Sequence, residues 1–190
     1  MLPLSARNQV LVGLLLALVM AATRVQYASA LGHLPDASWA LFFLAGVYLR
    51  PTWAFGALMG EAVLLDFAAV TWGGVSSFCI TPAYALLLPA HGVLWFAGRW
   101  YAGRHHPTWF GLLRLAASAF VGTALAEIIA SGGFYLFSGR FADVSLAGLA
   151  ARLVEYFPTS LAATALYVGL AALTHALFVA ASHRPAARAT

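Results

Sequence analysis

The sequence contains one cysteine, no lysine and few charges of either sign. Ten arginines and six acids make up 8% of its 190 residues. A single thiol cannot form an intramolecular disulfide, so a disulfide-stabilised fold is excluded. Cys79 could be an inert buried thiol, a reactive thiol or a soft metal ligand. The sequence has no Cys-x-x-Cys, no Gly-x-Ser-x-Gly, no zinc-type histidine spacing and no nucleotide-binding loop.

Apolar residues account for 63% of the chain, which indicates that its solvent is a lipid bilayer. The arginines stand at the ends of apolar runs and form no basic face, so nucleic-acid binding is not expected. We predict one all-α integral membrane domain, residues 1–190, with six transmembrane helices. The predicted spans are residues 8–30, 37–49, 52–72, 81–100, 110–137 and 157–181.

The first span resembles a signal peptide, with Ala28-Ser29-Ala30 as its cleavage site. Because Arg24 interrupts the stretch before that site, we expect a retained helix. The second span is short, and Arg50-Pro51 separates it from the third. With the N-terminus inside, seven arginines are cytoplasmic and three are external, as the positive-inside rule requires. Two basic termini on the inner side require an even number of spans, which supports including the second.

Three acids fall within the predicted spans, where ionised groups are costly and commonly functional. Asp66 lies about two turns from the external end of the third span, Glu61 lies deeper, and Glu127 lies in the fifth. Each acid either lines a pocket or pairs with a neighbour for structural reasons. We give Asp66 the strongest claim to a pocket.

The segment from Cys79 to Tyr84 follows a polar break on the predicted external side. Pro82 sets how the chain enters the fourth helix, and Tyr84 lies five residues after the thiol. Ring and thiol could therefore face one cavity, although an interfacial anchor is the alternative role for the tyrosine. Arg152, in the predicted external loop 138–156, either pairs with Glu155 or offers its guanidinium to a ligand.

Other aromatic residues on the predicted external side also have two interpretations. They form either a belt in contact with lipid or the wall of a pocket for a large, flat ligand. They are Trp72, Phe78, Tyr135, Tyr156 and Phe157.

Small residues recur at every fourth position in three of the spans. They are Gly13, Ala17 and Ala21 in the first, Gly56 and Gly60 in the third, and Ser118, Gly122, Ala126 and Ala130 in the fifth. Such stripes allow helices to approach closely. Packing within the bundle is the main interpretation, and docking to a separate membrane partner is the other.

A chain of this length, with six predicted helices and both termini in the cytoplasm, resembles the S-components of energy-coupling factor vitamin transporters. Ala17 and Ala21 are similar to the alanine patch through which S-components meet their coupling subunit. The single external cysteine, with Asp66 before it and Tyr84 and Arg152 after it, resembles the solitary BtuM-like vitamin B12 transporters of Gram-negative bacteria. The resemblance covers essentially the whole chain.

The resemblance implies a multi-pass protein of the bacterial inner membrane that takes up cobalamin. It implies that Cys79 is an axial ligand of the cobalt and can displace cyanide from cyanocobalamin. Asp66, Tyr84 and Arg152 would surround the same pocket, and a coupling subunit could dock on Ala17 and Ala21. No cofactor of the protein's own is expected.

Three alternatives remain open. They are an S-component for another vitamin, a membrane thiol enzyme in which His33 activates Cys79, and a structural or assembly subunit.

Overall fold

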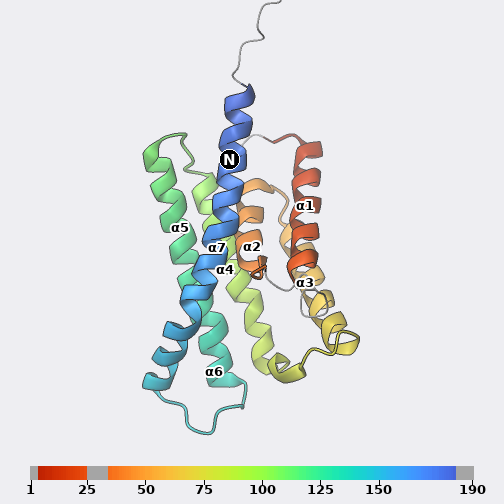
Figure 1. Cartoon of the computed structure of the whole chain (residues 1–190), viewed down its shortest axis with the longest axis vertical. Coiled ribbons are helices and arrows are strands. Elements are labelled where there is room, and N and C mark those ends of the chain that lie inside the picture. The colour runs from red at the N-terminus through yellow and green to blue at the C-terminus, as the bar shows by residue number, and fades with distance from the viewer. Residues whose placement is uncertain (1–3, 25–33, 183–190) are drawn as a thin grey trace, which may run out of the picture.

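A computed structural model describes residues 4–24 and 34–182, and every regular element in these two ranges is helical. The long elements are α1 (Ala6–Arg24), α3 (Trp53–Thr71), α4 (Leu87–Ala102), α5 (Trp109–Glu127) and α7 (Leu146–Ser182). The short ones are α2 (Ser38–Tyr48), α6 (Gly133–Phe137), the 3₁₀ turns η2 (Ser77–Cys79) and η3 (Pro82–Leu86), and the π turn η4 (Ile128–Gly132). Figure 1 shows them as one bundle.

Four helical stretches are long and apolar enough to cross a bilayer. They are Ala6–Arg24, Trp53–Thr71, Trp109–Phe137 and Leu146–Ala181. Most of their side chains lie on the outside of the bundle, where lipid would contact them. The chain is therefore a helical membrane protein, as its composition predicts.

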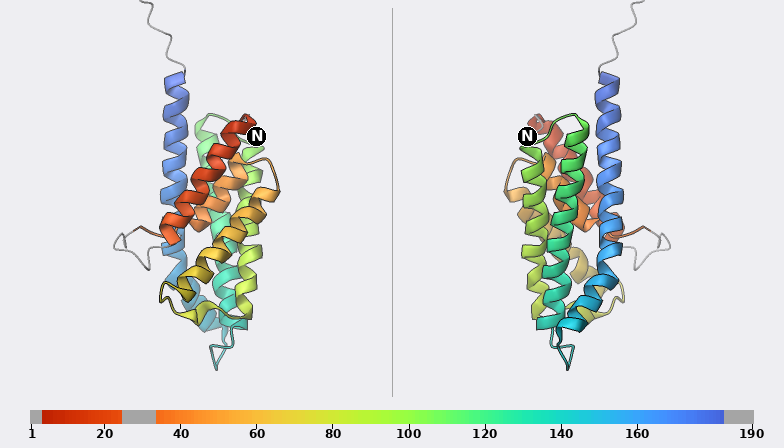
Figure 2. Two further views of the ribbon diagram at one scale, coloured as in Figure 1. Left: turned by 90° about the vertical axis from the view of Figure 1, so that its right-hand side faces the viewer. Right: turned by 90° about the vertical axis from the view of Figure 1, so that its left-hand side faces the viewer.

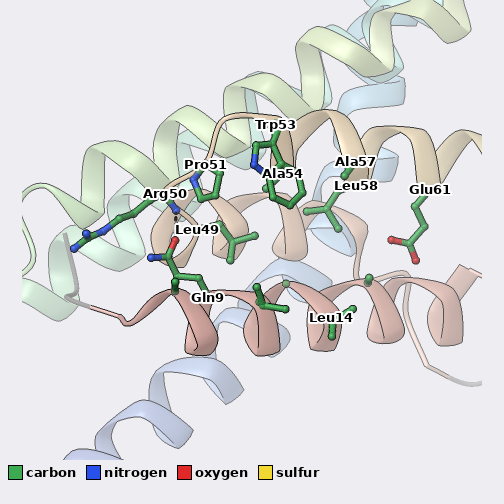
Figure 3. Close-up of a pocket in the computed structure, with 14 residues that line it drawn as sticks. Gln9, Leu14, Leu49, Arg50, Pro51, Trp53, Ala54, Ala57, Leu58 and Glu61 are labelled. Carbon is green, nitrogen blue, oxygen red and sulfur yellow. Dashed lines mark hydrogen bonds between the residues drawn. The ribbon is translucent and has the colours of Figure 1, made fainter.

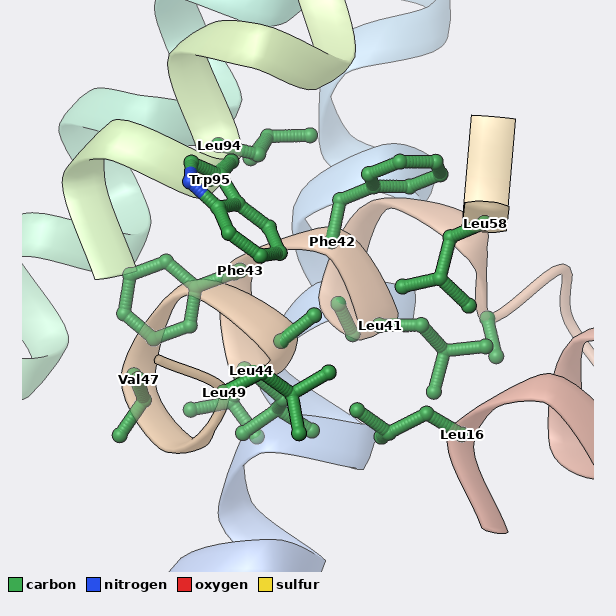
Figure 4. Close-up of a cluster of buried hydrophobic side chains, with 14 of the residues drawn as sticks. Leu16, Leu41, Phe42, Phe43, Leu44, Val47, Leu49, Leu58, Leu94 and Trp95 are labelled. Carbon is green, nitrogen blue, oxygen red and sulfur yellow. The ribbon is translucent and has the colours of Figure 1, made fainter. Parts of the chain in front are cut away.

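The short second span corresponds to α2, which has 11 residues and lies at the centre of the bundle. It packs most closely against α4 and also contacts α1, α3, α5 and α7. Phe42 and Phe43 are completely buried in the hydrophobic cluster of Figure 4. At 11 residues, α2 is shorter than the roughly 20 residues of a typical membrane span, and its neighbours shield it from lipid.

Two glycines allow α2 and α4 to approach closely. A Cβ atom on Gly46 would collide with the carbonyl of Trp95, and one on Gly98 would collide with the carbonyl of Phe43. Because lipid gives helices little hydrophobic reason to associate, such close backbone contact supplies van der Waals energy that a bulkier residue would remove.

The small-residue stripes differ in what they contact. On α5, Ser118, Gly122 and Ala126 are buried, and the hydroxyl of Ser118 donates a 2.8 Å hydrogen bond to the carbonyl of Ala97 on α4. On α3, a Cβ at Gly56 or Gly60 would meet nothing within 4 Å. Packing within the bundle thus explains the stripe on α5 and not the one on α3.

The last helix begins earlier than the predicted span. α7 starts at Leu146, so the predicted loop 138–156 is partly helical and Arg152 lies on a helix instead. The segment 146–155 is rich in Ala and Leu, which favour helix strongly enough to extend it through Pro158. Figure 2 shows α7 bent in its first half, as expected where proline removes a backbone hydrogen bond.

Candidate functional site

Asp66 and Tyr84 meet at the external end predicted for the bundle. The Tyr84 hydroxyl donates a 2.7 Å hydrogen bond to Oδ2 of Asp66. Thr81 is extended, and Pro82 at the start of η3 fixes the backbone that turns Tyr84 toward α3. The structure therefore brings together two of the predicted site residues.

Arg24, the last residue of α1, completes this cluster. Its Nε lies 3.3 Å from Oδ1 of Asp66, so the carboxylate receives a phenol on one oxygen and a guanidinium on the other. This is the only ion pair among the described residues. A cation and a hydrogen bond offset the cost of placing a carboxylate within the membrane.

Two buried donors of the same region have no hydrogen-bond partner within the described ranges. They are Nη1 of Arg24 and the hydroxyl of Thr81. Buried polar groups are normally satisfied, so unpaired donors beside a charged cluster fit a site whose ligand supplies acceptor oxygens. Arg24, Asp66 and Tyr84 would then hold such a ligand between α1, α3 and η3.

Sequence analysis did not identify Arg24 as a site residue. Forty-two positions separate it from Asp66, and no local pattern joins them. The sequence did contain a sign of this role, because an arginine that interrupts an apolar stretch in a membrane protein requires a partner.

Cys79 ends the 3₁₀ turn η2, three residues before Pro82 opens the next helical segment. The hydroxyl of Ser76 accepts a hydrogen bond from the amide of Phe78 and caps this turn. The turn holds the backbone of Cys79 in the connection between α3 and α4, as predicted. The side chain of Cys79 and all of His33 lie outside the part of the chain that the structure describes.

Arg152 does not pair with Glu155 among the described contacts, so that alternative is wrong. Its guanidinium lies instead over the ring of Phe141, 4.1 Å from the ring centre, with Tyr135 and Tyr156 at 5.6 and 6.0 Å. The three aromatic rings provide a cation–π site that the guanidinium of Arg152 occupies in place of a pair with Glu155.

A chain of aromatic rings connects Arg152 to the cysteine turn. Phe78, adjacent to Cys79, contacts Phe134 at 5.7 Å between ring centres, and Phe134 contacts Phe141 at 6.1 Å. Phe141 in turn carries the guanidinium of Arg152. Part of the predicted aromatic ring is thus a connected wall, whereas Trp72 is 79% exposed and resembles a lipid anchor.

The other two acids within the spans have different surroundings. Glu127 is buried, and its two oxygens accept hydrogen bonds from the hydroxyls of Ser131 and Ser160. These contacts tie α5 and η4 to α7, and they give Glu127 a structural role. Glu61 instead borders an open groove between α1 and α3.

This groove has a volume of about 620 Å³ and an almost entirely apolar lining, which includes Ala17 and Leu14 (Figure 3). Gln9 lies at its other end, where its side-chain oxygen accepts a hydrogen bond from the Arg50 amide. Asp66, Tyr84 and Arg152 do not line it. The groove is therefore separate from the polar cluster, and it includes one of the two alanines predicted to meet a partner.

The described residues contain no group of three or more His, Cys, Asp or Glu that could hold a metal ion by themselves. No protein-family model matches the chain, and no curated protein matches it.

Proposed function

We propose that this membrane protein binds cobalamin (vitamin B12) at the external end of the bundle and takes it up across the bacterial inner membrane. The observation that supports this most directly is the Arg24–Asp66–Tyr84 cluster beside the turn that carries the only thiol. Cobalamin brings its own corrin nitrogens to the cobalt, so the protein needs to supply only one soft ligand.

Cys79 is that ligand in this proposal. A thiolate suits a polarisable metal centre, and an ordinary thiol near pKa 8.5 must lose its proton when it coordinates. With cyanocobalamin, the sulfur replaces cyanide on cobalt and the thiol proton leaves with cyanide as hydrogen cyanide. The cobalt keeps its oxidation state, so this exchange needs no reductant.

The neighbouring side chains suit the rim of a corrin, which carries amide groups around an apolar ring. Unpaired donors on Arg24 and Thr81 would bind amide oxygens, and Asp66 would accept from amide nitrogens. Asp66 does not activate the thiol, because a nearby negative charge raises a thiol pKa. The wall from Phe78 to Arg152 offers aromatic faces to the ring.

The proposed topology has six spans with both termini in the cytoplasm. Among described residues, the end of the bundle drawn uppermost in Figure 1 carries the most arginines, at Arg7, Arg50, Arg99, Arg104 and Arg114. The opposite end has Arg140 and Arg152, and Arg24 lies on the same side in the cluster with Asp66. The positive-inside rule then turns the Arg24–Asp66–Tyr84 cluster outward.

A coupling subunit could dock on α1 in this proposal. Ala17 lines the groove of Figure 3, and Ala21 is half-buried one turn further along α1. Small residues beside an open apolar groove permit close approach of another transmembrane helix.

The visible absorption spectrum of the purified protein with cyanocobalamin tests the proposal, compared with Cys79→Ser. We expect a shifted corrin spectrum that the serine variant lacks, together with release of one cyanide per protein. Vitamin bound without a shift would remove the role of Cys79 as ligand. If neither protein binds the vitamin, cobalamin is not the substrate, and other vitamins should be screened.

A further inference from the structure

A second cavity lies at the arginine-rich end of the bundle, away from the proposed cobalamin site. Its volume is about 450 Å³, and its walls come from α2, α5 and α7 together with the end of α4 and the 103–108 connection. Most of the lining is apolar and includes Val47, Leu112, Leu115 and Val168. This apolar lining suits a hydrocarbon chain.

Histidines and tyrosines gather on the lining of this cavity. Tyr48 from α2, Tyr101 from α4 and His175 from α7 converge there with His105 and His106. The Tyr101 Oη and His105 Nδ1 atoms are 2.8 Å apart, and the rings of His105 and His175 meet edge to face with centres 6.0 Å apart. The cluster therefore links three helices through ring and hydrogen-bond contacts.

The charge around this cluster favours an anion. None of the residues that line the cavity is acidic. Exposed Arg104 and Arg114 belong to the same connection and the start of α5, and Arg114 donates a hydrogen bond to the Arg104 carbonyl. Imidazole N–H groups, phenols and nearby guanidiniums can all donate to phosphate oxygens.

We infer that this cavity is a binding site for an anionic phospholipid, with the acyl chain along the apolar wall and the phosphate beside His105, His106 and His175. Basic pockets between transmembrane helices are known to select acidic headgroups. Figure 2 shows α7 rising past the ends of the other helices. A lipid at this position would join α7 to the rest of the bundle.

Histidine makes such a site sensitive to pH. Burial lowers the pKa of His105, and the neighbouring imidazoles of His175 and His106 lower it further. The other groups that face it are the phenols of Tyr101 and Tyr48, which are neutral near pH 7, and the more distant Arg104 and Arg114. A phosphate would favour protonated His105, so lipid binding should strengthen as the pH falls.

Native mass spectrometry of the full-length protein in detergent, titrated with phosphatidylglycerol or phosphatidylcholine of identical chains, tests the inference. We expect tighter binding of phosphatidylglycerol, with a larger preference at pH 6 than at pH 8. His105→Gln and His175→Gln should each weaken it about fivefold at pH 6, as expected for one basic group near a lipid phosphate.

The matched control is Arg140→Gln, which removes a cation from the opposite end of the bundle and should leave the preference unchanged. Equal binding of the two lipids by the wild type at pH 6 would overturn the inference. So would an equal loss in Arg140→Gln, or displacement of the lipid by millimolar inorganic phosphate, which would indicate a site for free phosphate.

Discussion

At the scale of single residues, Asp66 depends on two neighbours of different kinds. Arg24 supplies a charge and Tyr84 supplies a hydrogen bond, and the three come from separate parts of the chain. A half-buried ion pair contributes to stability mainly because it avoids leaving a charge without a partner. The arrangement therefore predicts that losing one partner costs more than losing both.

Arg24→Met should lower the free energy of unfolding in detergent by about 2 kcal/mol, less than for a fully buried pair because Asp66 is partly exposed. The double variant Arg24→Met/Asp66→Leu should recover most of that loss. A double-mutant cycle measures the difference. Additive effects of the two substitutions would show that the pair is not coupled.

Tyr84→Phe removes only the hydroxyl that binds Asp66. We expect a smaller loss of stability, about 1 kcal/mol, because Arg24 still neutralises the carboxylate. If the site binds cobalamin, the same variant should also weaken vitamin affinity, whereas Tyr156→Phe should leave stability unchanged because its hydroxyl makes no described hydrogen bond. Thermal unfolding of the three proteins checks this.

His105 gives the protein a pH dependence of its own. Its lowered pKa means that the unfolded chain binds more protons than the native state between the ordinary value of about 6.5 and the lower native value. Native stability should therefore fall as the pH drops below about 6.5. Unfolding in lipid-free detergent from pH 5 to 8 measures this slope. His105→Gln should flatten it more than the exposed control His106→Gln; equal slopes in all three proteins would contradict the assignment.

The sequence predicted only in part which polar and charged side chains contact one another. Asp66 and Tyr84 stood out because a polar group within an apolar run needs an explanation, and the structure places them in contact. Arg24 and the ring contacts of Arg152 could not be predicted, because both depend on how distant helices are arranged. The proposed ligand role of Cys79 stays a prediction.

At the scale of helices, the contact between α2 and α4 depends on glycine. Gly98→Ala should destabilise the bundle by about 3 kcal/mol or more, because the new methyl group meets the Phe43 carbonyl and the backbones must separate. Gly92→Ala, on the same helix, meets nothing within 4 Å and should stabilise by about 0.5–1 kcal/mol through helix propensity. Unfolding in detergent distinguishes the two, and equal effects would contradict the close contact.

Apolar run lengths predicted the long helices well, because the thickness of a bilayer sets how many residues a span needs. They predicted the ends less well. The start of α7 at Leu146 follows from helix propensity in a segment whose polarity suggested a loop. The central position of α2 follows from its packing against α4, and hydropathy alone carries no information about neighbours.

At the scale of the whole molecule, the apolar surface of four long helices requires a membrane, and the orientation proposed above follows from the positive-inside rule. The arginine-rich end, with its histidine-lined cavity, and the Arg24–Asp66–Tyr84 cluster would then face different compartments. The two proposed ligands, an acidic lipid and cobalamin, would approach from opposite sides. Both proposals therefore depend on the orientation of the protein in the membrane.

The single cysteine allows a direct measurement of this orientation. In intact spheroplasts, a membrane-impermeant maleimide should label Cys79 in the wild type, because the proposed topology turns the connection between α3 and α4 outward. Ser5→Cys, placed in a Cys79→Ser background, should be labelled only after the membrane is permeabilised. The reverse pattern would place the thiol in the cytoplasm, where it could not meet cobalamin arriving from outside. It would also place the cavity beside His105 in the outer leaflet.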